Sequence, residues 1–380
     1  ETILLFRIGD FYETFGKDAI KAAEILGIVL TKRRNGAASE IELAGFPHHA
    51  LNAYLPKLVR AGQRVAVCDQ LEDPKQAKGV VKRGVTDIVT PGIAYDEQLL
   101  DHGRANYLAA LNFHSGSQVG AAFVEVSTGE FFCFSGTTEE VEKLLYSLKP
   151  AELVAARKDI ASVRNSFGED FYVFRLEDWA FEPGYAKEQL LRHFRVSNLK
   201  GFALEDEPLG TIAAGVLLHY LAENEQHELH HITRIYRFRE QRHLMLDKFT
   251  IRNLELLEPL FPDGEAFVDG LDATRTSMGG RLLRQWVIFP LREQAAIEGR
   301  LAKVETLLQE RGLRPKLTEE LGGMSDLERL LSRLATGKLA PREALSLRRT
   351  LERTAPLWEQ LEGNEMVAAA FKDLLNERPD

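Results

Sequence analysis

An aromatic residue and a carboxylate lie two positions apart near the start of the chain, at Phe11 and Glu13, directly after Gly9-Asp10. The apolar residues 3–8 precede them, and this order predicts a strand, a tight turn and a helix over residues 11–26. In that helix Asp10 is the N-cap and Glu13 its capping-box partner. Such a corner can present a flat apolar ring and a hydrogen-bonding carboxyl group to the same point of a binding partner.

The pattern alone leaves two interpretations of Phe11. At 100° per residue, Phe11 lies about 60° from the centre of the predicted helix's apolar face, between a core position and an exposed one. Glu13 points away from that face, so we expect it to be exposed, where capping the helix is a sufficient role.

Composition bounds the class of protein. The 380 residues are 44% apolar, which is enough for about two or three domains with sizeable cores. Two cysteines, Cys68 and Cys133, exclude a disulfide framework and have no metal-ligand spacing, which is typical of a reduced, cytoplasmic protein. No apolar run approaches the roughly 20 residues of a membrane span, so we expect no membrane partner. Because the chain begins at Glu1 and not Met, we expect it to be a segment of a longer protein.

The net charge of −9 is unevenly distributed. Residues 1–91 carry 13 Lys+Arg and 11 Asp+Glu, whereas the remainder carries 35 and 46. Clustered cations on an otherwise acidic body suit a protein that contacts phosphates locally. The alternative is that they are solvated loops. The candidate residues for DNA backbone contacts are Lys32, Arg33, Arg34, Lys75 and Lys78.

The hydrophobic pattern predicts a multidomain fold, α/β followed by all-α. Residues 1–92 form a compact α/β unit, with strands at 28–32, 41–44, 64–70 and 86–89 and a helix after Pro47. Residues 93–230 form a second α/β unit, with a hairpin at 119–135, a helix capped by Thr138, strands at 152–156 and 171–176, and helices at 186–195 and 209–225. Residues 231–380 place Leu, Arg and Glu at helical spacing and are predicted to be all-helical.

Five separated blocks, in order along the chain, resemble the MutS family of DNA mismatch-repair proteins. The resemblance is loose between about residues 106 and 230. The first block runs through Asp10-Phe11-Tyr12-Glu13 and the segments 30–33, 44–50, 65–70 and 90–92, and the others are residues 246–255, 271–274, 278–286 and 326–330.

The resemblance implies three domains: a small mixed α/β mismatch-recognition domain at 1–92, a connector with a ribonuclease-H-like sheet at 93–230, and an incomplete helical core, or lever, at 231–380. It implies that Phe11 is a wedge that stacks on a mispaired or unpaired base from the minor groove. Unstacking a mismatch costs less than unstacking a correct pair, so this wedge reads deformability. The resemblance also implies that Glu13 hydrogen-bonds the distorted base, and nearby phosphates would raise the pKa of this carboxyl group and favour a protonated donor.

The family further implies partners and cofactors. We expect binding to double-stranded DNA with mismatches or small insertion/deletion loops, in post-replicative repair of DNA damage in the bacterial cytosol, associated with the nucleoid. In the longer protein we expect homodimers, a MutL-type partner docking on the connector, and an ATPase domain that binds ATP and Mg²⁺. On this segment we expect no cofactor.

No catalytic residue is predicted on this segment. The phosphate-binding pattern G-x-x-x-x-G-K-[ST] is missing, since Gly16-Lys17 is followed by Asp18 and Gly337-Lys338 by Leu339. Residues 227–231 match HExxH literally, but the β-branched pair Ile232-Thr233 is poor for a helix and Arg234 stands where the longer zinc-protease pattern has glycine, so we predict no zinc site.

Two alternatives of other classes stay open. A structure-specific nuclease needs carboxylates converging on two metals, and Glu125 is the single acid in the first hairpin strand. An interaction scaffold without DNA binding is the second alternative, against which Phe11, Glu13 and the basic clusters argue.

Overall fold

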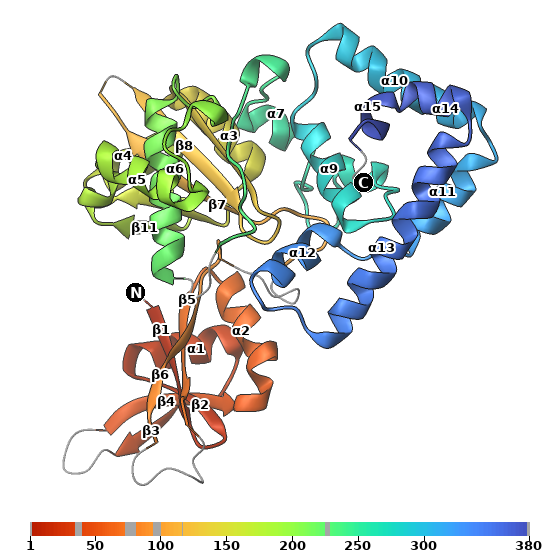
Figure 1. The fold of residues 1–380 in the computed structure, drawn as a ribbon. Helices are drawn as coiled ribbons and strands as arrows, with labels where there is room; N and C mark the ends of the chain where they lie inside the picture. Colours follow the sequence, from red (N-terminus) through yellow and green to blue (C-terminus); the bar gives the residue numbers. More distant parts are fainter. Residues whose placement is uncertain are drawn as a thin grey trace.

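The computed structural model describes residues 2–34, 40–72, 81–93, 100–115, 117–224 and 229–377. It confirms the predicted class, because two mixed sheets with helices on their faces are followed by a helical region (Figure 1). In the helices that the structure describes, no stretch is both long and apolar enough to cross a membrane.

The first domain is a six-stranded sheet in the order β3-β4-β2-β1-β5-β6. The central pair β1 and β5 is parallel, and the other neighbours are antiparallel. Its elements are β1 (Thr2–Ile8), β2 (Phe11–Phe15), α1 (Gly16–Leu26), β3 (Thr31–Arg34), β4 (Glu40–Pro47), η1 (His48–Ala50), α2 (Leu51–Arg60), β5 (Arg64–Gln70) and β6 (Arg83–Val89).

The predicted helix over residues 11–26 is wrong in its first five residues. Gly9 has a positive φ of 58°, and Ile8 pairs with Phe11, so the chain turns back as a β-hairpin. Burial then alternates with the period of a strand, with Tyr12 and Thr14 buried. The helix begins at Gly16, and therefore Asp10 and Glu13 do not form the predicted capping box.

Helices α1 and α2 cover one face of this sheet. Ile3, Leu5 and Tyr12 from the strands pack there with Ala22 of α1 and Leu58 of α2. The predicted apolar stripe of α1 holds at Ala19, Ala22 and Leu26, whereas Phe15 is the residue before the helix. The opposite face of the sheet carries no helix of this domain (Figure 1).

The second domain is also a six-stranded sheet, in the order β11-β10-β7-β8-β9-β12. The predicted hairpin is confirmed as β8 and β9, but the buried central strand β7 was not predicted. The helix cap is Thr137, one residue before the predicted Thr138, in a capping box with Glu140. The elements are β7 (Tyr107–Phe113), β8 (Gln118–Glu125), β9 (Glu130–Thr137), α3 (Thr138–Leu148), β10 (Glu152–Ala156), η2 (Arg157–Asp159), α4 (Ile160–Phe167), β11 (Val173–Leu176), η3 (Asp178–Phe181), α5 (Pro183–Phe194), η4 (Lys200–Phe202), α6 (Pro208–Asn224) and β12 (Tyr236–Arg237).

Helix α6 is the centre of one of the two cores of this domain. The sequence predicts a single buried stripe on it, but the helix is buried on nearly all sides, between the sheet and α5. Gly215 makes this possible, because a Cβ there would overlap the backbone of Ala186 in α5. The other core lies on the opposite face of the sheet, under α3 and α4.

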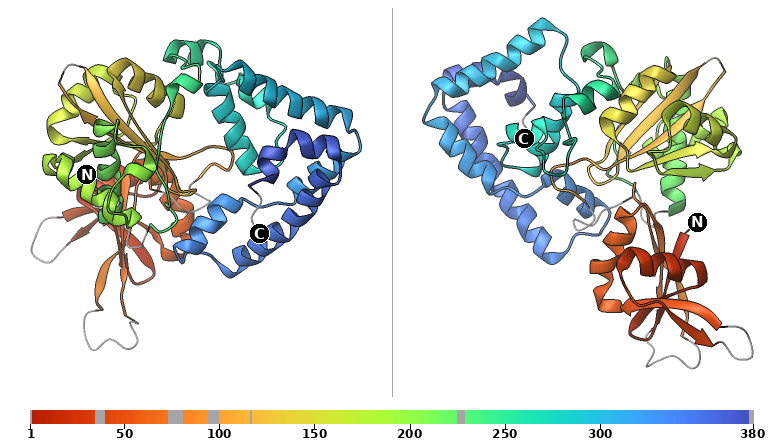
Figure 2. Two further views of the ribbon diagram at one scale, coloured as in Figure 1. Left: turned by 45° about the horizontal axis from the view of Figure 1, so that its top comes forward. Right: turned by 180° about the vertical axis from the view of Figure 1, so that it is seen from behind.

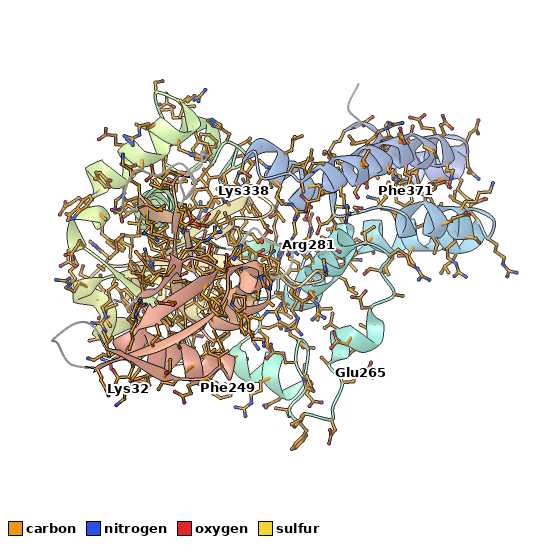
Figure 3. The ribbon with its side chains drawn as sticks, turned by 90° about the horizontal axis from the view of Figure 1, so that it is seen from below. Lys32, Phe249, Glu265, Arg281, Lys338 and Phe371 are labelled. Carbon is orange, nitrogen blue, oxygen red and sulfur yellow. The ribbon has the colours of Figure 1, made fainter. Side chains whose placement is uncertain are left out.

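The third domain is helical, as predicted. Its helices extend away from the two sheets as an open frame (Figure 2). Seen from below, Phe371, between α14 and α15, lies at the right, whereas Lys32 of the first domain lies at the lower left (Figure 3). The elements are η5 (Glu240–Arg242), α7 (Lys248–Asn253), α8 (Phe267–Leu271), α9 (Ser277–Ile288), α10 (Gln294–Gln309), α11 (Leu313–Gly322), α12 (Leu327–Ala335), α13 (Pro341–Glu362), α14 (Glu365–Ala370) and α15 (Lys372–Leu375).

The first and second domains meet at a buried carboxylate, Glu152 of β10. It accepts hydrogen bonds from Thr90 Oγ1 at 2.5 Å, Gly92 N at 3.1 Å and Tyr220 Oη at 2.6 Å. Burial raises the pKa of Glu152 despite these donors. Gly92 is required here, because a Cβ would lie 2.9 Å from Glu152 Cβ.

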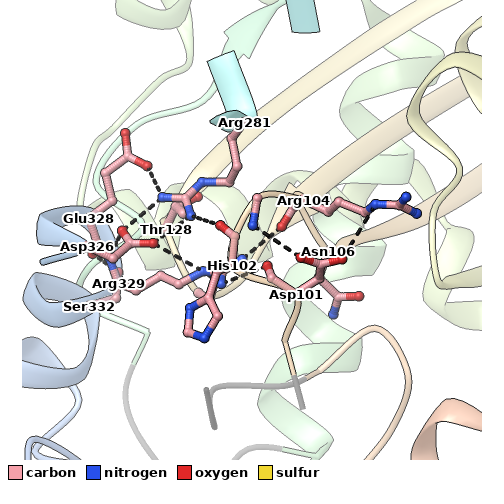
Figure 4. A network of polar contacts seen from close by, with 12 residues as sticks. Asp101, His102, Arg104, Asn106, Thr128, Arg281, Asp326, Glu328, Arg329 and Ser332 are labelled. Atoms are coloured by element: carbon pink, nitrogen blue, oxygen red, sulfur yellow. Dashed lines mark hydrogen bonds and ion pairs between the residues drawn. The ribbon is translucent and has the colours of Figure 1, made fainter. Parts of the chain in front are cut away.

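The second and third domains meet at two buried arginines (Figure 4). Arg281 of α9 forms a bidentate ion pair with Asp326 at 2.6 and 2.9 Å, and bonds Glu328 at 2.6 Å. Burial acts to raise the pKa of Asp326, but the bonds with Arg281 outweigh burial and hold this pKa below its ordinary value. Arg281 also donates to His102 O at 3.2 Å, in the segment that leads from the first domain into the second.

Arg329 of α12 is the second of these arginines, and it is only 2% exposed. Its guanidinium donates to Asp101 O at 3.0 Å, Arg104 O at 2.9 Å and Ser127 Oγ at 3.1 Å (Figure 4). The third domain therefore holds both the segment around residues 101–104 and the β8–β9 turn.

Arg329→Ala should destabilise the protein by about 3 kcal/mol, because it leaves Asp326 short of a cation and three buried acceptors without their donor. Thermal and urea unfolding measure this loss, and the exposed Arg311→Ala is the matched control, expected to stay within about 0.5 kcal/mol of the parent. Equal midpoints for the two variants would contradict the assigned role of Arg329.

Candidate nucleic-acid interface

The uncovered face of the first sheet is the candidate interface. Strand alternation places Phe11 and Glu13 of β2 on this face, since their neighbours Tyr12 and Thr14 point into the core. Leu4, Phe6 and Ile8 of β1 share the face, because Phe6 pairs with Glu13 and Ile8 with Phe11. An antiparallel region with one packed face and one open face has a surface free to meet a partner.

Phe11 lies at the rim of this face, at the β1–β2 turn. It pairs with Ile8 on one side and Pro47 on the other, and 46% of its surface is exposed. The turn is fixed from outside, because His48 N donates to Asp10 O at 2.8 Å. The core interpretation of Phe11 is therefore wrong.

The β1–β2 turn lies at the end of the sheet away from the second domain. Strands β1 and β5 run parallel, with Thr2 beside Arg64. Arg64 contacts the second domain, since it hydrogen-bonds Asn224 and lies over the ring of Phe174. Phe11 pairs with Ile8 at the other end of β1 and is accordingly clear of that domain.

Glu13 is less exposed than predicted, because it is paired. Its carboxylate lies 3.1 Å from Arg33 Nη1, and its side chain is only 18% exposed. Gly45 of β4 lies between the two strands that carry them and opposite Glu13. A Cβ at Gly45 would come within 3.4 Å of Glu13 Cγ and 2.8 Å of Tyr12 O. Glycine at this position therefore leaves room for the Glu13 side chain to reach Arg33 across β4.

The structure separates the predicted cations. Arg33 shares the face of Glu13, whereas its neighbour Lys32, opposite Glu42, alternates to the other face and is exposed at the sheet edge. The side chain of Arg34 lies outside the described residues, as do Lys75 and Lys78.

Sequence reasoning missed the residues that brace β1 and β2. Tyr12 Oη and Arg7 Nη1 each donate to Asp69 of β5 at 2.8 Å. Arg83 Nε donates to Arg7 O at 2.8 Å, and its guanidinium lies 5.5 Å from the ring centre of Phe6. The only signal in the sequence was that Asp69 lies in one of the segments that resemble the MutS family.

Both titrating groups of this brace are shifted. Burial, reinforced by the bond to Asp69, raises the pKa of Tyr12 far above its ordinary value, so the phenol stays a donor. Burial acts to raise the pKa of Asp69, but hydrogen bonds from Gln70 N, Tyr12 and Arg7 outweigh it and lower this pKa.

Within the described part of the chain, the zinc and nuclease alternatives gain no site. Among the described residues, no three His, Cys, Asp or Glu side chains gather as a metal site. His227 and Glu228 of the HExxH match lie outside the described residues, and His231 donates from Nε2 to Val126 O at 2.7 Å. Glu125 is buried and accepts from Ser127 Oγ at 2.7 Å, as a structural acceptor would.

These features define a modular protein whose first domain exposes an aromatic and charged sheet face and is joined through an α/β domain to a helical arm. Models of MutS domain I, MutS domain II and MutS domain III match residues 1–98, 106–233 and 249–378, in that order. The chain belongs to the MutS family.

Similar proteins include three that are each named DNA mismatch repair protein MutS. The protein from Cytophaga hutchinsonii is 48% identical over 359 residues, which cover 94% of this chain and 42% of the relative. Those from Christiangramia forsetii and Porphyromonas gingivalis are each 47% identical over 94% of this chain, and over 41% and 40% of their own lengths. The chain thus spans less than half the length of these relatives and covers domains I to III.

Asp69→Asn should destabilise the protein at neutral pH by about 1–2 kcal/mol, because it weakens the bonds from Arg7 and Tyr12. The pKa of Asp69 is lower in the folded state, so its contribution is complete above the ordinary value near 4 and is lost as the pH falls through the folded value. In thermal melts between pH 7 and pH 3, the difference in melting temperature between parent and variant should therefore stay constant at first and shrink below about pH 4.

The exposed Asp87→Asn, on β6 of the same sheet, is the control, and its difference from the parent should stay small throughout. A difference for Asp69→Asn that widens in acid would refute this account of the brace.

Proposed function

We propose that this protein binds duplex DNA at mispaired or unpaired bases, in DNA mismatch repair, with Phe11 as the wedge and Glu13 as the hydrogen-bonding group. The observation that carries the proposal is the position of Phe11: an exposed ring on a fixed turn, two residues from a carboxylate on the same open sheet face. The naming of the relatives as DNA mismatch repair proteins supports it.

The wedge acts through the cost of deforming DNA. Inserting a ring between base steps costs a few kcal/mol of stacking at a correct pair and less at a mismatch, which is already poorly stacked. A ring held on a hairpin loses little conformational freedom when it inserts. Preference for a mismatch then requires no identification of the bases.

The ion pair of Glu13 with Arg33 gives the carboxylate a way to approach DNA. A lone carboxylate is repelled by phosphates, whereas the Glu13–Arg33 pair is neutral overall. When a phosphate competes for Arg33, Glu13 is released toward a displaced base. Against intact duplex, where no base is displaced, the released charge penalises binding and adds to the discrimination.

The properties of the longer protein are part of the same proposal. We infer an ATP-dependent, Mg²⁺-requiring homodimer that works at the nucleoid in the cytoplasm and recruits a MutL-type protein through the second domain. Membership of the MutS family supports each of these assignments.

Phe11→Ala should remove the preference for mismatched over matched duplex while leaving stability nearly unchanged, because the ring is already half exposed. A buried phenylalanine would instead cost about 3–5 kcal/mol. Fluorescence anisotropy with the two duplexes and a thermal melt measure both effects. Leu4→Ala, at a similarly exposed position of the same face, is the control and should keep the preference.

Lys32→Gln and Arg33→Gln should both weaken binding to matched and mismatched duplex, and each should reduce the salt slope by about 0.9. Arg33→Gln should weaken binding more, because it also leaves Glu13 unpaired beside phosphates. The double variant Arg33→Gln/Glu13→Gln should regain part of the DNA affinity that Arg33→Gln loses. Unchanged affinity and slope in a salt titration of both single variants would place the DNA path elsewhere.

A further inference from the structure

A pocket of about 470 Å³ lies where the second domain meets α9 and α10. Its cationic lining comes from Arg237, Arg239, Arg242 and Arg300, and its apolar lining includes Trp286 and Phe289. We call it the arginine pocket. It belongs to the second and third domains and has no residue in common with the candidate DNA face, so its test is independent of the proposed function.

The charge of the arginine pocket is opposite to that of the chain. No acidic residue lines it, although the chain carries a net charge of −9. Arg237 pairs with the buried Glu207. For the other three arginines, the described side chains offer no carboxylate within ion-pairing distance. Three arginines therefore line the pocket without a carboxylate partner among the described side chains.

The floor of the pocket is apolar and fixed. Phe289 is 4% exposed and packs against Phe238, with ring centres 5.2 Å apart. Trp286 is 42% exposed, and Arg300 lies over its ring at 3.7 Å. His243 stacks on Phe289, and its buried Nδ1 finds no hydrogen-bond partner within the described part of the chain. The pocket thus combines cationic side chains, which have no carboxylate partner among the described residues, with an apolar base.

We propose that the arginine pocket binds an acidic peptide segment of a partner protein, with carboxylates on the arginines and a neighbouring apolar side chain against Trp286 and Phe289. Arginine forms bidentate, charge-assisted hydrogen bonds with carboxylates. Partly exposed tryptophan and arginine are also the residue types that dominate binding energy at protein interfaces. The complementary charge selects an acidic occupant.

Nucleic acid fits the pocket less well. Stacking of bases needs open ring faces, but Phe289 is buried and Arg300 already covers one face of Trp286. A phosphate backbone has no apolar group to cover the floor, and a duplex is too wide to enter a cavity of this size. An apolar side chain beside a carboxylate satisfies both parts of the pocket.

Fluorescence anisotropy with a labelled short peptide that alternates aspartate and phenylalanine tests the proposal on the 380-residue protein. We expect saturable binding, about tenfold tighter than that of the same peptide with asparagine in place of aspartate. Arg300→Gln and Arg242→Gln should each weaken binding about tenfold, and rising salt should weaken it further. Arg311→Gln, at an exposed position away from the pocket, should bind like the parent.

Several outcomes would overturn the proposal. One is equal affinity for the aspartate and asparagine peptides, and another is an equal loss in Arg311→Gln. Displacement of the peptide by inorganic phosphate or a single-stranded oligonucleotide at equal concentration would instead indicate a general anion site or a nucleic-acid site. If Arg300→Gln fails to fold in a thermal melt, Arg242→Gln decides, because its side chain is exposed and supports no core.

Discussion

The arrangement of the three domains depends on two arginines that are removed from water. Arg281 and Arg329 reach from α9 and α12 to the carbonyl groups of residues 101–104, where the chain enters the second domain. A buried guanidinium is costly unless every donor finds an acceptor, so these contacts form together or not at all. The helical arm is thereby attached to the same short segment that leads from the first domain.

The junction between the first two domains follows the same rule with the opposite charge. Glu152 is buried and accepts from Thr90, Gly92 and Tyr220. Together the two junctions hold both ends of the segment that connects the first sheet to the second domain, at residues 90–92 and 101–104. Phe11, which pairs with Ile8 at the far end of β1, lies away from both junctions and is half exposed.

Pairing of charges distinguishes the two candidate binding surfaces. On the first sheet Glu13 and Arg33 neutralise one another, and a ligand must compete for them. In the arginine pocket the structure supplies no such internal partner for Arg239, Arg242 or Arg300 among the described side chains, so a ligand would supply the counter-ion. The first arrangement suits discrimination between similar ligands, whereas the second favours capture of one charge type.

The sequence by itself determined the class of fold, the order of the three domains and the family, because hydrophobic periodicity and short motifs are local properties of the chain. It proposed Phe11 and Glu13 as site residues but assigned them to a helix, since Asp10 three residues before Glu13 imitates a capping box. Only the tertiary structure decided that they lie on a strand, because pairing with β1 and β4 outweighs a local helix signal. The pairing of Glu13 with Arg33, the opposite faces of Arg33 and Lys32, and the burial of Arg329 also required the fold, since each depends on residues far apart in sequence whose approach no local pattern records.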